Sequence, residues 1–293
     1  MAELKIAGIM RAGAFSPNHI GNDSAIFNLV ADQLRKRGCT VNTYSEEQLI
    51  AGEVNERIVV NMCREQRSMQ MLQKMEDDGA LVINSGYGIE NCTRERMTRI
   101  LIGRGIPYPE SIIVNTDEAI RDTLRIRGFE ACWIKRGDFH TMHKEDVSYA
   151  RHPQEAQELL QEYFMRGIKR AVINRHLPGD LIKFYGVRGT DFFYWFYPFS
   201  DGAARRVSAA SPDDSAQREV KFDEQRMIAL CRRAADEMDI TVYGGDCIVS
   251  PDGQIRIIDF NDWPSFAPCR TQAAPVIARR IMAMVKEHNS KNA

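Results

Sequence analysis

Three oxygen-bearing side chains, Asp246, Asp259 and Asn261, lie at the ends of two short apolar segments near the C-terminus of this 293-residue chain. The segments flank Pro251-Asp252-Gly253, which is typical of a tight turn, so the stretch is expected to form a β-hairpin. Carboxylate and amide oxygens on rigid strands suit Mg²⁺, which proteins bind through one or two carboxylates together with substrate phosphates. The alternative is an ordinary surface hairpin, in which these side chains only end a strand and begin a turn.

The register of the hairpin decides whether the three side chains meet. Asp259 and Asn261 are two residues apart, so on one strand they share a face. A two-residue or four-residue loop places Asp246 opposite Asp259, whereas a three-residue loop turns Asp246 to the other face. Carboxylates clustered in this way repel each other without a metal. We therefore expect Asp259→Asn to abolish turnover with little loss of stability.

The hairpin resembles the metal-binding signature of the ATP-grasp superfamily, because Gly244-Gly245-Asp246 is followed by Asp259-x-Asn261 and then by Pro264. The resemblance implies that the chain uses ATP with Mg²⁺ or Mn²⁺. Members of the superfamily activate a carboxylate as an acyl phosphate and join it to an amine or a thiol, and a smaller branch phosphorylates inositol phosphates. Further upstream, Asn84-Ser85 and Gly105-Ile106-Pro107 are similar to a segment of the glutathione synthetase and ribosomal-protein glutamate ligase types.

The resemblance also implies a set of nucleotide contacts. Lys135 matches a lysine at the end of a central strand that contacts the ATP phosphates, and a compact ammonium suits a phosphate oxygen. Lys183 matches a second phosphate-contacting lysine, seen especially in the inositol phosphate kinases. Val172, Ile173 and Asn174 fall where the superfamily offers backbone groups to the edge of adenine.

Two features depart from the superfamily pattern. The usual glycine-rich loop is absent, and the segment that carries His140 and His143 looks closer to the histidine-bearing loop of inositol trisphosphate 5/6-kinases. These histidines are therefore candidate cofactor-binding residues, with ordinary solvated loop histidines as the alternative. Glu95 stands where the family carries a basic nucleotide contact, and either Arg94 or Arg96 could replace that contact.

The polar segment 200–218 contains few apolar residues, so it is a candidate mobile lid. Arg205 and Arg206 lie within this segment. They are candidate catalytic residues, since a guanidinium can bind an anionic substrate or a phosphoryl group in transfer.

Composition limits the classes of partner. The chain has 39 basic and 40 acidic residues and a net charge of −1, so no overall field favours nucleic acid or a membrane surface. Its 7 cysteines are scattered without a C-x-x-C motif, which argues against a disulfide framework or a zinc site and fits a reducing cytosol. The N-terminus lacks the features of a signal peptide. A cytoplasmic location is expected.

Strands and helices alternate in the first 83 residues, which predicts an open parallel sheet. Asn22-Asp23-Ser24 could cap a helix that continues to Arg37. Ligands of such sheets usually bind beyond the carboxyl ends of the strands, where the loop 11–24 would lie. No G-x-G-x-x-G motif follows the first strand, so a dinucleotide site is not supported. The expected strands are 4–10, 39–44, 58–62 and 80–83.

Together these features predict a fold of mixed α/β and α+β class. The resemblance implies an ATP-grasp fold, in which an N-terminal Rossmann-like (pre-ATP-grasp) lobe at 1–107 precedes two α+β lobes that clasp ATP. These are a central lobe at 108–174 and a C-terminal lobe with the metal site at 175–293.

The expected activity is that of a carboxylate–amine or carboxylate–thiol ligase, whose partners are ATP and a small-molecule carboxylate or peptide. The alternatives are a small-molecule kinase of the inositol phosphate type and a nucleotide-binding protein without catalysis. The sequence leaves open whether the protein is a monomer or a homodimer.

Overall fold

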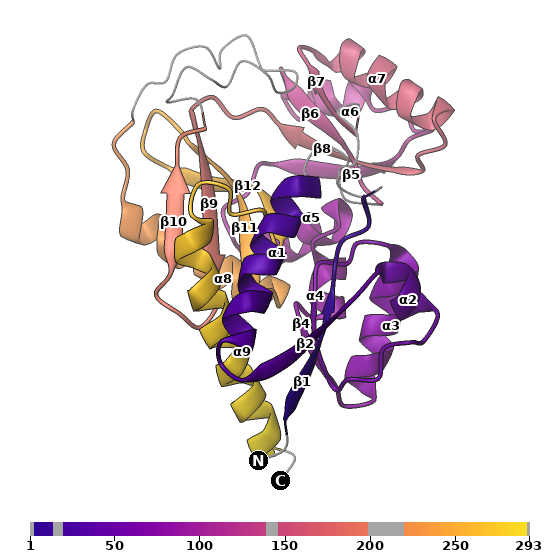
Figure 1. The fold of residues 1–293 in the computed structure, drawn as a ribbon. Helices are drawn as coiled ribbons and strands as arrows, with labels where there is room; N and C mark the ends of the chain where they lie inside the picture. Colours follow the sequence, from indigo (N-terminus) through magenta and orange to yellow (C-terminus); the bar gives the residue numbers. More distant parts are fainter. Residues whose placement is uncertain (1–2, 14–19, 139–145, 199–219, 292–293) are drawn as a thin grey trace.

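The computed structural model describes residues 3–13, 20–138, 146–198 and 220–291, which form three four-stranded sheets (Figure 1). We refer to them as the N-terminal, central and C-terminal sheets. Four candidate site residues lie outside the described residues, as does the candidate lid 200–218: His140, His143, Arg205 and Arg206.

The N-terminal sheet is parallel, as the sequence predicts, with the strand order β2-β1-β3-β4. Its alternating side chains serve two cores: Ile6 packs toward α1 and α9, whereas Ala7 and Ile9 pack toward α2 and α3. The strands are β1 (Leu4–Ile9), β2 (Cys39–Tyr44), β3 (Ile58–Asn61) and β4 (Leu81–Ile83). The helices are α1 (Ile20–Arg35), α2 (Glu46–Ile50), α3 (Gln66–Asp77) and α9 (Arg270–Lys291).

Helix α9, from the far end of the chain, lies beside α1 on the N-terminal sheet (Figure 1). Its buried residues Ile277 and Ile281 belong to the same apolar cluster as Ile6 and Val30. The division at 107 and 174 stays a prediction, and this core extends across it. Helix α1 begins at Ile20, so the prediction that Asn22-Asp23-Ser24 caps the helix is wrong.

The central sheet is antiparallel, with the order β5-β8-β6-β7. Helices α6 and α7 cover one face, where Ile134 and Ile173 are fully buried. The opposite face carries Trp133, Lys135 and the side chains opposed to them. The elements are β5 (Ser111–Asn115), α6 (Arg121–Ile126), β6 (Cys132–Arg136), β7 (Val147–Ala150), α7 (Pro153–Met165) and β8 (Arg170–Arg175).

The C-terminal sheet is also antiparallel, with the order β10-β9-β11-β12. Helices α5 and α8 pack on one of its faces around Phe184 and Phe260. The helix expected from about Ile89 is two helices, because the chain breaks at Cys92 and Thr93. The elements are α4 (Gly86–Asn91), α5 (Arg94–Gly103), β9 (Asp180–Val187), β10 (Phe193–Phe196), α8 (Glu224–Met238), β11 (Val242–Val249) and β12 (Ile255–Asp262).

Asn84 joins the N-terminal sheet to the C-terminal sheet. Its side-chain amide donates to the carbonyl of Val242 at 2.8 Å, and its side-chain oxygen accepts from the backbone N–H groups of Thr241 at 3.0 Å and Val242 at 2.8 Å. Asn84 is 1% exposed. One amide therefore satisfies three buried backbone groups, which couples the two sheets directly.

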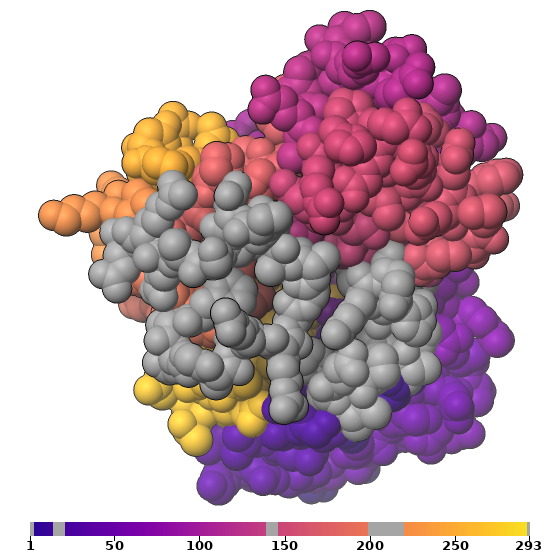
Figure 2. Space-filling view, turned by 90° about the horizontal axis from the view of Figure 1, so that it is seen from above, coloured from indigo at the N-terminus to yellow at the C-terminus, as the bar shows by residue number. Residues whose placement is uncertain are grey.

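The view from above shows the central sheet and its helices as a body at the upper right, with the N-terminal residues at the bottom (Figure 2). No helix in the described parts of the chain is long and apolar enough to cross a membrane.

Candidate active site

The candidate metal ligands lie on the face of the C-terminal sheet that points away from α8. Phe196, Lys183, Asp246 and Asp259 are directly opposed across the four strands, so they form one row. Asn261 lies two residues beyond Asp259 on β12 and therefore on the same face. The predicted meeting of Asp246 with Asp259 in the register is confirmed.

The route to this register differs from the prediction. Ser250 donates to the carbonyl of Gln254 at 2.9 Å, so the turn has three residues rather than an even number. Such a turn alone would place Asp246 opposite Ile258. Instead, the register shifts between Asp246 and Cys247, and Ile258 has no partner on β11. This β-bulge returns Asp246 to the side of Asp259.

Each carboxylate has its own cation. Lys183 Nζ lies 2.7 Å from Asp246 Oδ1, and Arg94 NH1 lies 2.7 Å from Asp259 Oδ1. Burial opposes the charge on Lys183, but Asp246 outweighs that effect and raises the pKa of the ammonium. Burial would likewise raise the pKa of Asp259, yet Arg94, Lys135 and a hydrogen bond from Asn261 outweigh it and lower that pKa to about 2.

This pairing argues against the reason for one expectation from the sequence. We expected the carboxylates to repel each other without a metal, so that Asp259→Asn would cause little loss of stability. The lowered pKa of Asp259 shows that its charge is stabilised by its surroundings, above all by Arg94. Asp259→Asn would remove the ion pair between Asp259 and the nearly buried guanidinium of Arg94, so the substitution should destabilise the protein.

Lys135 reaches this group from the central sheet. Its Nζ donates to the carbonyl of Ile258, the bulge residue, at 3.1 Å. Burial lowers the pKa of Lys135 to about 7, and the nearby Arg94 adds to that effect, while Asp259 and Asp246 oppose it. The ammonium therefore lies between two sheets, close to both carboxylates. Lys135 and Lys183 come from different sheets, as predicted.

Arg94 and Glu95, at the start of α5, contact opposite sheets. Arg94 pairs with Asp259 of the C-terminal sheet, whereas Glu95 pairs with Arg170 of the central sheet at 3.0 Å. The backbone N–H of Glu95 also donates to the carbonyl of Gly137 at 3.0 Å. Arg96 pairs with Glu90, and its side chain is 52% exposed. The sequence left open whether Arg94 or Arg96 replaces the basic nucleotide contact of the family. Arg94 is the one that faces the site.

The backbone contacts expected from Val172, Ile173 and Asn174 are not available from this strand. They lie in β8, which is paired on one side with β5 and on the other with β6, so their backbone groups are part of the two ladders. Ile173 points into the core beneath α7, whereas Val172 and Asn174 lie on the face of Lys135. The connection 176–179, between the central and C-terminal sheets, lies beyond the ladders.

An aromatic cluster on the same face as Lys135 was missed by the sequence reasoning. Trp133 lies directly opposite Tyr149, with ring centroids 5.0 Å apart, and its indole donates to His176 Nδ1 at 3.2 Å. The signal was available, because Trp133 precedes Lys135 by two residues on one strand and must share its face. A partly exposed indole such as that of Trp133 can stack on a planar ring.

The donor set fits a magnesium ion that is shared with a phosphorylated ligand. In the described ranges no cluster of three or more His, Cys, Asp or Glu side chains could hold a metal. Asp246 and Asp259 supply two carboxylates, and Asn261 adds an amide oxygen. Mg²⁺ is commonly bound by one or two carboxylates, with water and phosphate oxygens completing an octahedron. The set is therefore too small for a closed protein site and suited to an open one.

Solved structures resemble the whole chain. The D-alanine–D-alanine ligase from Bacillus anthracis superposes with a TM-score of 0.70 over 98% of this chain and 98% of its own, at 15% identity. The corresponding ligase from Coxiella burnetii gives 0.70 over 99% and 97%, at 13% identity. The ATP-grasp ligase PsnB, solved with its precursor peptide PsnA2 and AMPPNP, gives 0.62 over 96% and 98%, at 15% identity. This protein has the ATP-grasp fold.

In ATP-grasp terms, the central and C-terminal sheets of this chain are the two lobes that the resemblance implied. No protein-family model and no curated protein sequence matches the chain. The ATP-grasp assignment is therefore carried by the three-dimensional arrangement.

Proposed function

We propose that this chain is an ATP- and Mg²⁺-dependent ligase that activates a carboxylate for attack by an amine or a thiol. The observation that supports this most is the convergence of cations on the carboxylate pair. Lys183 comes from the C-terminal sheet, Lys135 from the central sheet and Arg94 from α5, and all three lie beside Asp246 or Asp259.

In this proposal the cations bind the phosphates of ATP. Lys135 and Lys183 approach from two sheets, so a phosphate group between them receives charge-assisted hydrogen bonds from both sides. Arg94 adds a planar pair of donors from a third direction. The ring of adenine lies against Trp133 and Tyr149, on the face that also carries Val172 and Asn174. The connection 176–179 supplies backbone groups that β8 itself does not offer.

Asp246, Asp259 and Asn261 hold the metal in this proposal. Mg²⁺ held there, or Mn²⁺ in its place, would supply positive charge against the negative charge of the ATP phosphates during phosphoryl transfer. The side chains have fixed positions because they project from adjacent strands of one antiparallel sheet. The Bacillus anthracis ligase, solved with ATP, and PsnB, solved with Mg and ADP, share the fold of this chain, which supports ATP and Mg²⁺ as the groups bound here.

The reaction needs positioning more than proton transfer. An oxygen of the substrate carboxylate attacks the γ-phosphorus, and ADP leaves with the electrons of the broken P–O bond. The amine or thiol then attacks the carbonyl carbon of the acyl phosphate, inorganic phosphate leaves with the electrons of the broken C–O bond, and the nucleophile releases its proton to solvent. Arg205 and Arg206, in the proposed lid, are candidates for stabilising the phosphoryl group. The substrate is a small-molecule carboxylate or a peptide, a choice supported by the D-alanine–D-alanine ligases and by PsnB with its precursor peptide, which share the fold.

The test incubates the protein with ATP, Mg²⁺ and pooled metabolites and identifies the products. ADP and free phosphate together with a new amide or thioester are expected. A phosphorylated alcohol with ADP would instead establish the kinase alternative, and the absence of any product would favour nucleotide binding without catalysis. Both alternatives remain predictions. Of the residues that favour the kinase, His140 and His143 lie outside the described residues, whereas His176 and Lys183 are described.

A second test concerns the site itself. Lys135→Met and Lys183→Met keep an apolar stem and remove the charge. Each is expected to weaken ATP binding by about 1.5–3 kcal/mol, the range for a hydrogen bond to a charged group. Calorimetry that gives unchanged affinity in both variants would contradict the assignment of the phosphate site.

A further inference from the structure

Asp262 is a buried carboxylate on the strand that carries the proposed metal ligands. Along β12 the side chains alternate, so Asp259 and Asn261 face the site, whereas Phe260 and Asp262 face away from it. Asp262 and Phe260 are both 0% exposed. The sequence reasoning gave Asp262 no role, although a fully buried carboxylate at the end of a strand requires partners of opposite charge.

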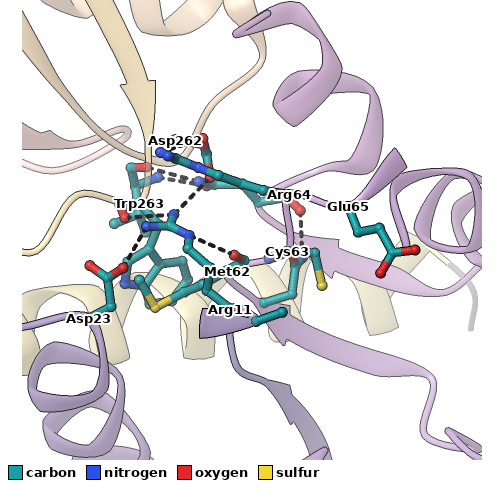
Figure 3. Close-up of polar contacts among 12 residues, drawn as sticks. Arg11, Asp23, Met62, Cys63, Arg64, Glu65, Asp262 and Trp263 are labelled. Atoms are coloured by element: carbon teal, nitrogen blue, oxygen red, sulfur yellow. Dashed lines mark hydrogen bonds and ion pairs between the residues drawn. The ribbon is translucent and has the colours of Figure 1, made fainter. Parts of the chain in front are cut away.

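Those partners come from the N-terminal sheet. Arg11 NH2 and Arg64 NH2 each lie 3.3 Å from an oxygen of Asp262, one oxygen for each arginine (Figure 3). Arg11 follows β1 and Arg64 follows β3, which are neighbouring parallel strands. The carboxyl ends of such strands usually bind ligands. Here a carboxylate from β12 of the same chain occupies that position.

Arg11 also forms hydrogen bonds with residues of other segments. Its guanidinium also donates to Asp23 at 2.9 Å, to the carbonyl of Met62 at 3.1 Å and to the carbonyl of Trp263 at 3.4 Å. The side chain is 4% exposed. Because Trp263 follows Asp262, Arg11 binds both the side chain and the backbone at the end of β12.

The two loops that carry these arginines are fixed by a second buried carboxylate. Glu46, which is 1% exposed, accepts from the backbone N–H of Ala12 at 2.9 Å, Arg64 at 3.2 Å and Glu65 at 2.9 Å. Arg11 and Arg64 therefore project from loops that share one hydrogen-bond acceptor. We call Arg11 and Arg64 the arginine clamp. Because both arginines project from loops of fixed position, they hold the carboxylate of Asp262 in one position.

We propose that Asp262 is a positioning residue of the metal-binding strand. The clamp of Arg11 and Arg64 fixes the end of β12, so that Asp259 and Asn261, on the opposite face, are aimed at the metal shared with ATP. Among the described strands, β11 alone pairs with β12, which lies at the edge of its sheet, and the clamp supplies a second fixed point. This inference rests on the proposed function, because it assigns Asp262 a task in the same site.

The experiment measures how much Mg²⁺ strengthens the binding of AMP-PNP, a non-hydrolysable ATP analogue. Calorimetry with excess Mg²⁺ and with EDTA gives two dissociation constants, and their ratio is the metal-dependent gain. In Asp262→Asn the affinity in EDTA should remain, because the lysines are untouched. The gain from Mg²⁺ should fall about tenfold, the lower end of the effect of removing a residue that orients metal ligands.

Asp23→Asn is the matched control. It also removes one buried carboxylate from Arg11, but Asp23 lies on α1 rather than on β12. This variant should be destabilised in thermal unfolding and should keep the gain from Mg²⁺. If Asp262→Asn does not fold, Arg64→Met is used instead, because it removes one arginine of the clamp and keeps Arg11. The gain in AMP-PNP affinity from Mg²⁺ should fall in this variant too.

Two results would overturn the inference. One is a full gain from Mg²⁺ in Asp262→Asn or, where that variant does not fold, in Arg64→Met. The other is an equal loss of the gain in Asp23→Asn, because the network would then support the fold without a specific action on the metal ligands. Asp259→Asn separates these failures from a failure of the proposed function. If Asp259→Asn keeps its gain, the metal site itself is refuted, and the role of Asp262 is refuted with it.

Discussion

At the scale of single residues, Arg94 and Arg96 show how neighbours on one helix differ. Arg94 lies against Asp259 with 7% of its side chain exposed, whereas Arg96 pairs with Glu90 at the surface. We predict that Arg94→Met weakens ATP binding by about 1.5–3 kcal/mol, because a charged donor to phosphate is lost. Arg96→Met should change the affinity by less than about 0.5 kcal/mol. Calorimetry with both variants measures this difference in ATP affinity, and equal effects of the two substitutions would contradict the prediction.

The pKa of Asp259 leads to a prediction about acid stability. Because its pKa is lowered from 3.8 to about 2 in the folded protein, its ionised form stabilises the fold at neutral pH. The stabilisation is fully present above the unfolded pKa and is lost as the pH falls through about 4 toward 2. At pH 7 we expect Asp259→Asn to lower the free energy of unfolding by about 2 kcal/mol, since one pKa unit corresponds to about 1.36 kcal/mol.

Urea unfolding at several pH values checks this sign. The difference between Asp259→Asn and the unsubstituted protein should shrink as the solution becomes more acidic. Asp32→Asn is the control, because Asp32 is 59% exposed and pairs with Arg35 at the surface, so it should have little effect at any pH. A stabilised Asp259→Asn protein would restore the repulsion argument that the ion pairs overturn.

At the scale of elements, the bulge in β12 is the decisive feature. Gly245 lies opposite Phe260, and a Cβ at this position would overlap the backbone carbonyl of Asp259 and crowd the ring of Phe184. The β11–β12 pair is therefore closely packed where the candidate metal ligands project. Its geometry depends on a residue without a side chain.

We predict that Gly245→Ala destabilises the protein by about 1–3 kcal/mol, because extra volume in a packed position forces the strands apart. The variant should also lose the Mg²⁺-dependent part of ATP-analogue binding. Gly103→Ala is the control, since a Cβ there meets nothing within 4 Å and alanine favours a helix. Thermal unfolding and calorimetry check both variants, and a neutral Gly245→Ala would show that the strands can separate without harm.

At the scale of the whole molecule, the N-terminal and C-terminal sheets form one unit. Asn84 connects them, α9 packs on the N-terminal sheet, and the buried charges around Arg11 link β1 and β3 to β12. The central sheet is attached through α5 and the connection 176–179. We expect the N-terminal and C-terminal sheets to unfold together.

Asn84→Ala tests this coupling. The substitution leaves the buried backbone N–H groups of Thr241 and Val242 without their acceptor, whereas the carbonyl of Val242 keeps its hydrogen bond from Trp263. We therefore expect a loss of about 2–4 kcal/mol. Asn91→Ala, which removes a single hydrogen bond to the carbonyl of Met238, should cost about 1 kcal/mol. Urea unfolding should show one transition for both sheets. Separate transitions for the two sheets would contradict the coupling.

Local patterns in the sequence determined the types of element and the chemistry of the candidate ligands. Strand β2 has the predicted bounds, since the pattern of a strand depends only on neighbouring residues. The order of Lys135, Lys183, Asp246 and Asp259 was sufficient to indicate a nucleotide and metal site. Residues two apart on a strand share a face whatever the rest of the chain does, so the pairing of Asp259 with Asn261 was also available.

The tertiary structure decided everything that depends on contacts between distant segments. A bulge at Ile258 restored a register that the turn alone would have misplaced, because strand pairing and core packing outweigh the preference of a loop. The choice of Arg94 over Arg96 follows from where α5 lies between two sheets. Asp262 gained its two arginines from residues about 200 and 250 positions away. Sequence spacing carries no information on such pairs, because burial and charge compensation select them only once the lobes are packed.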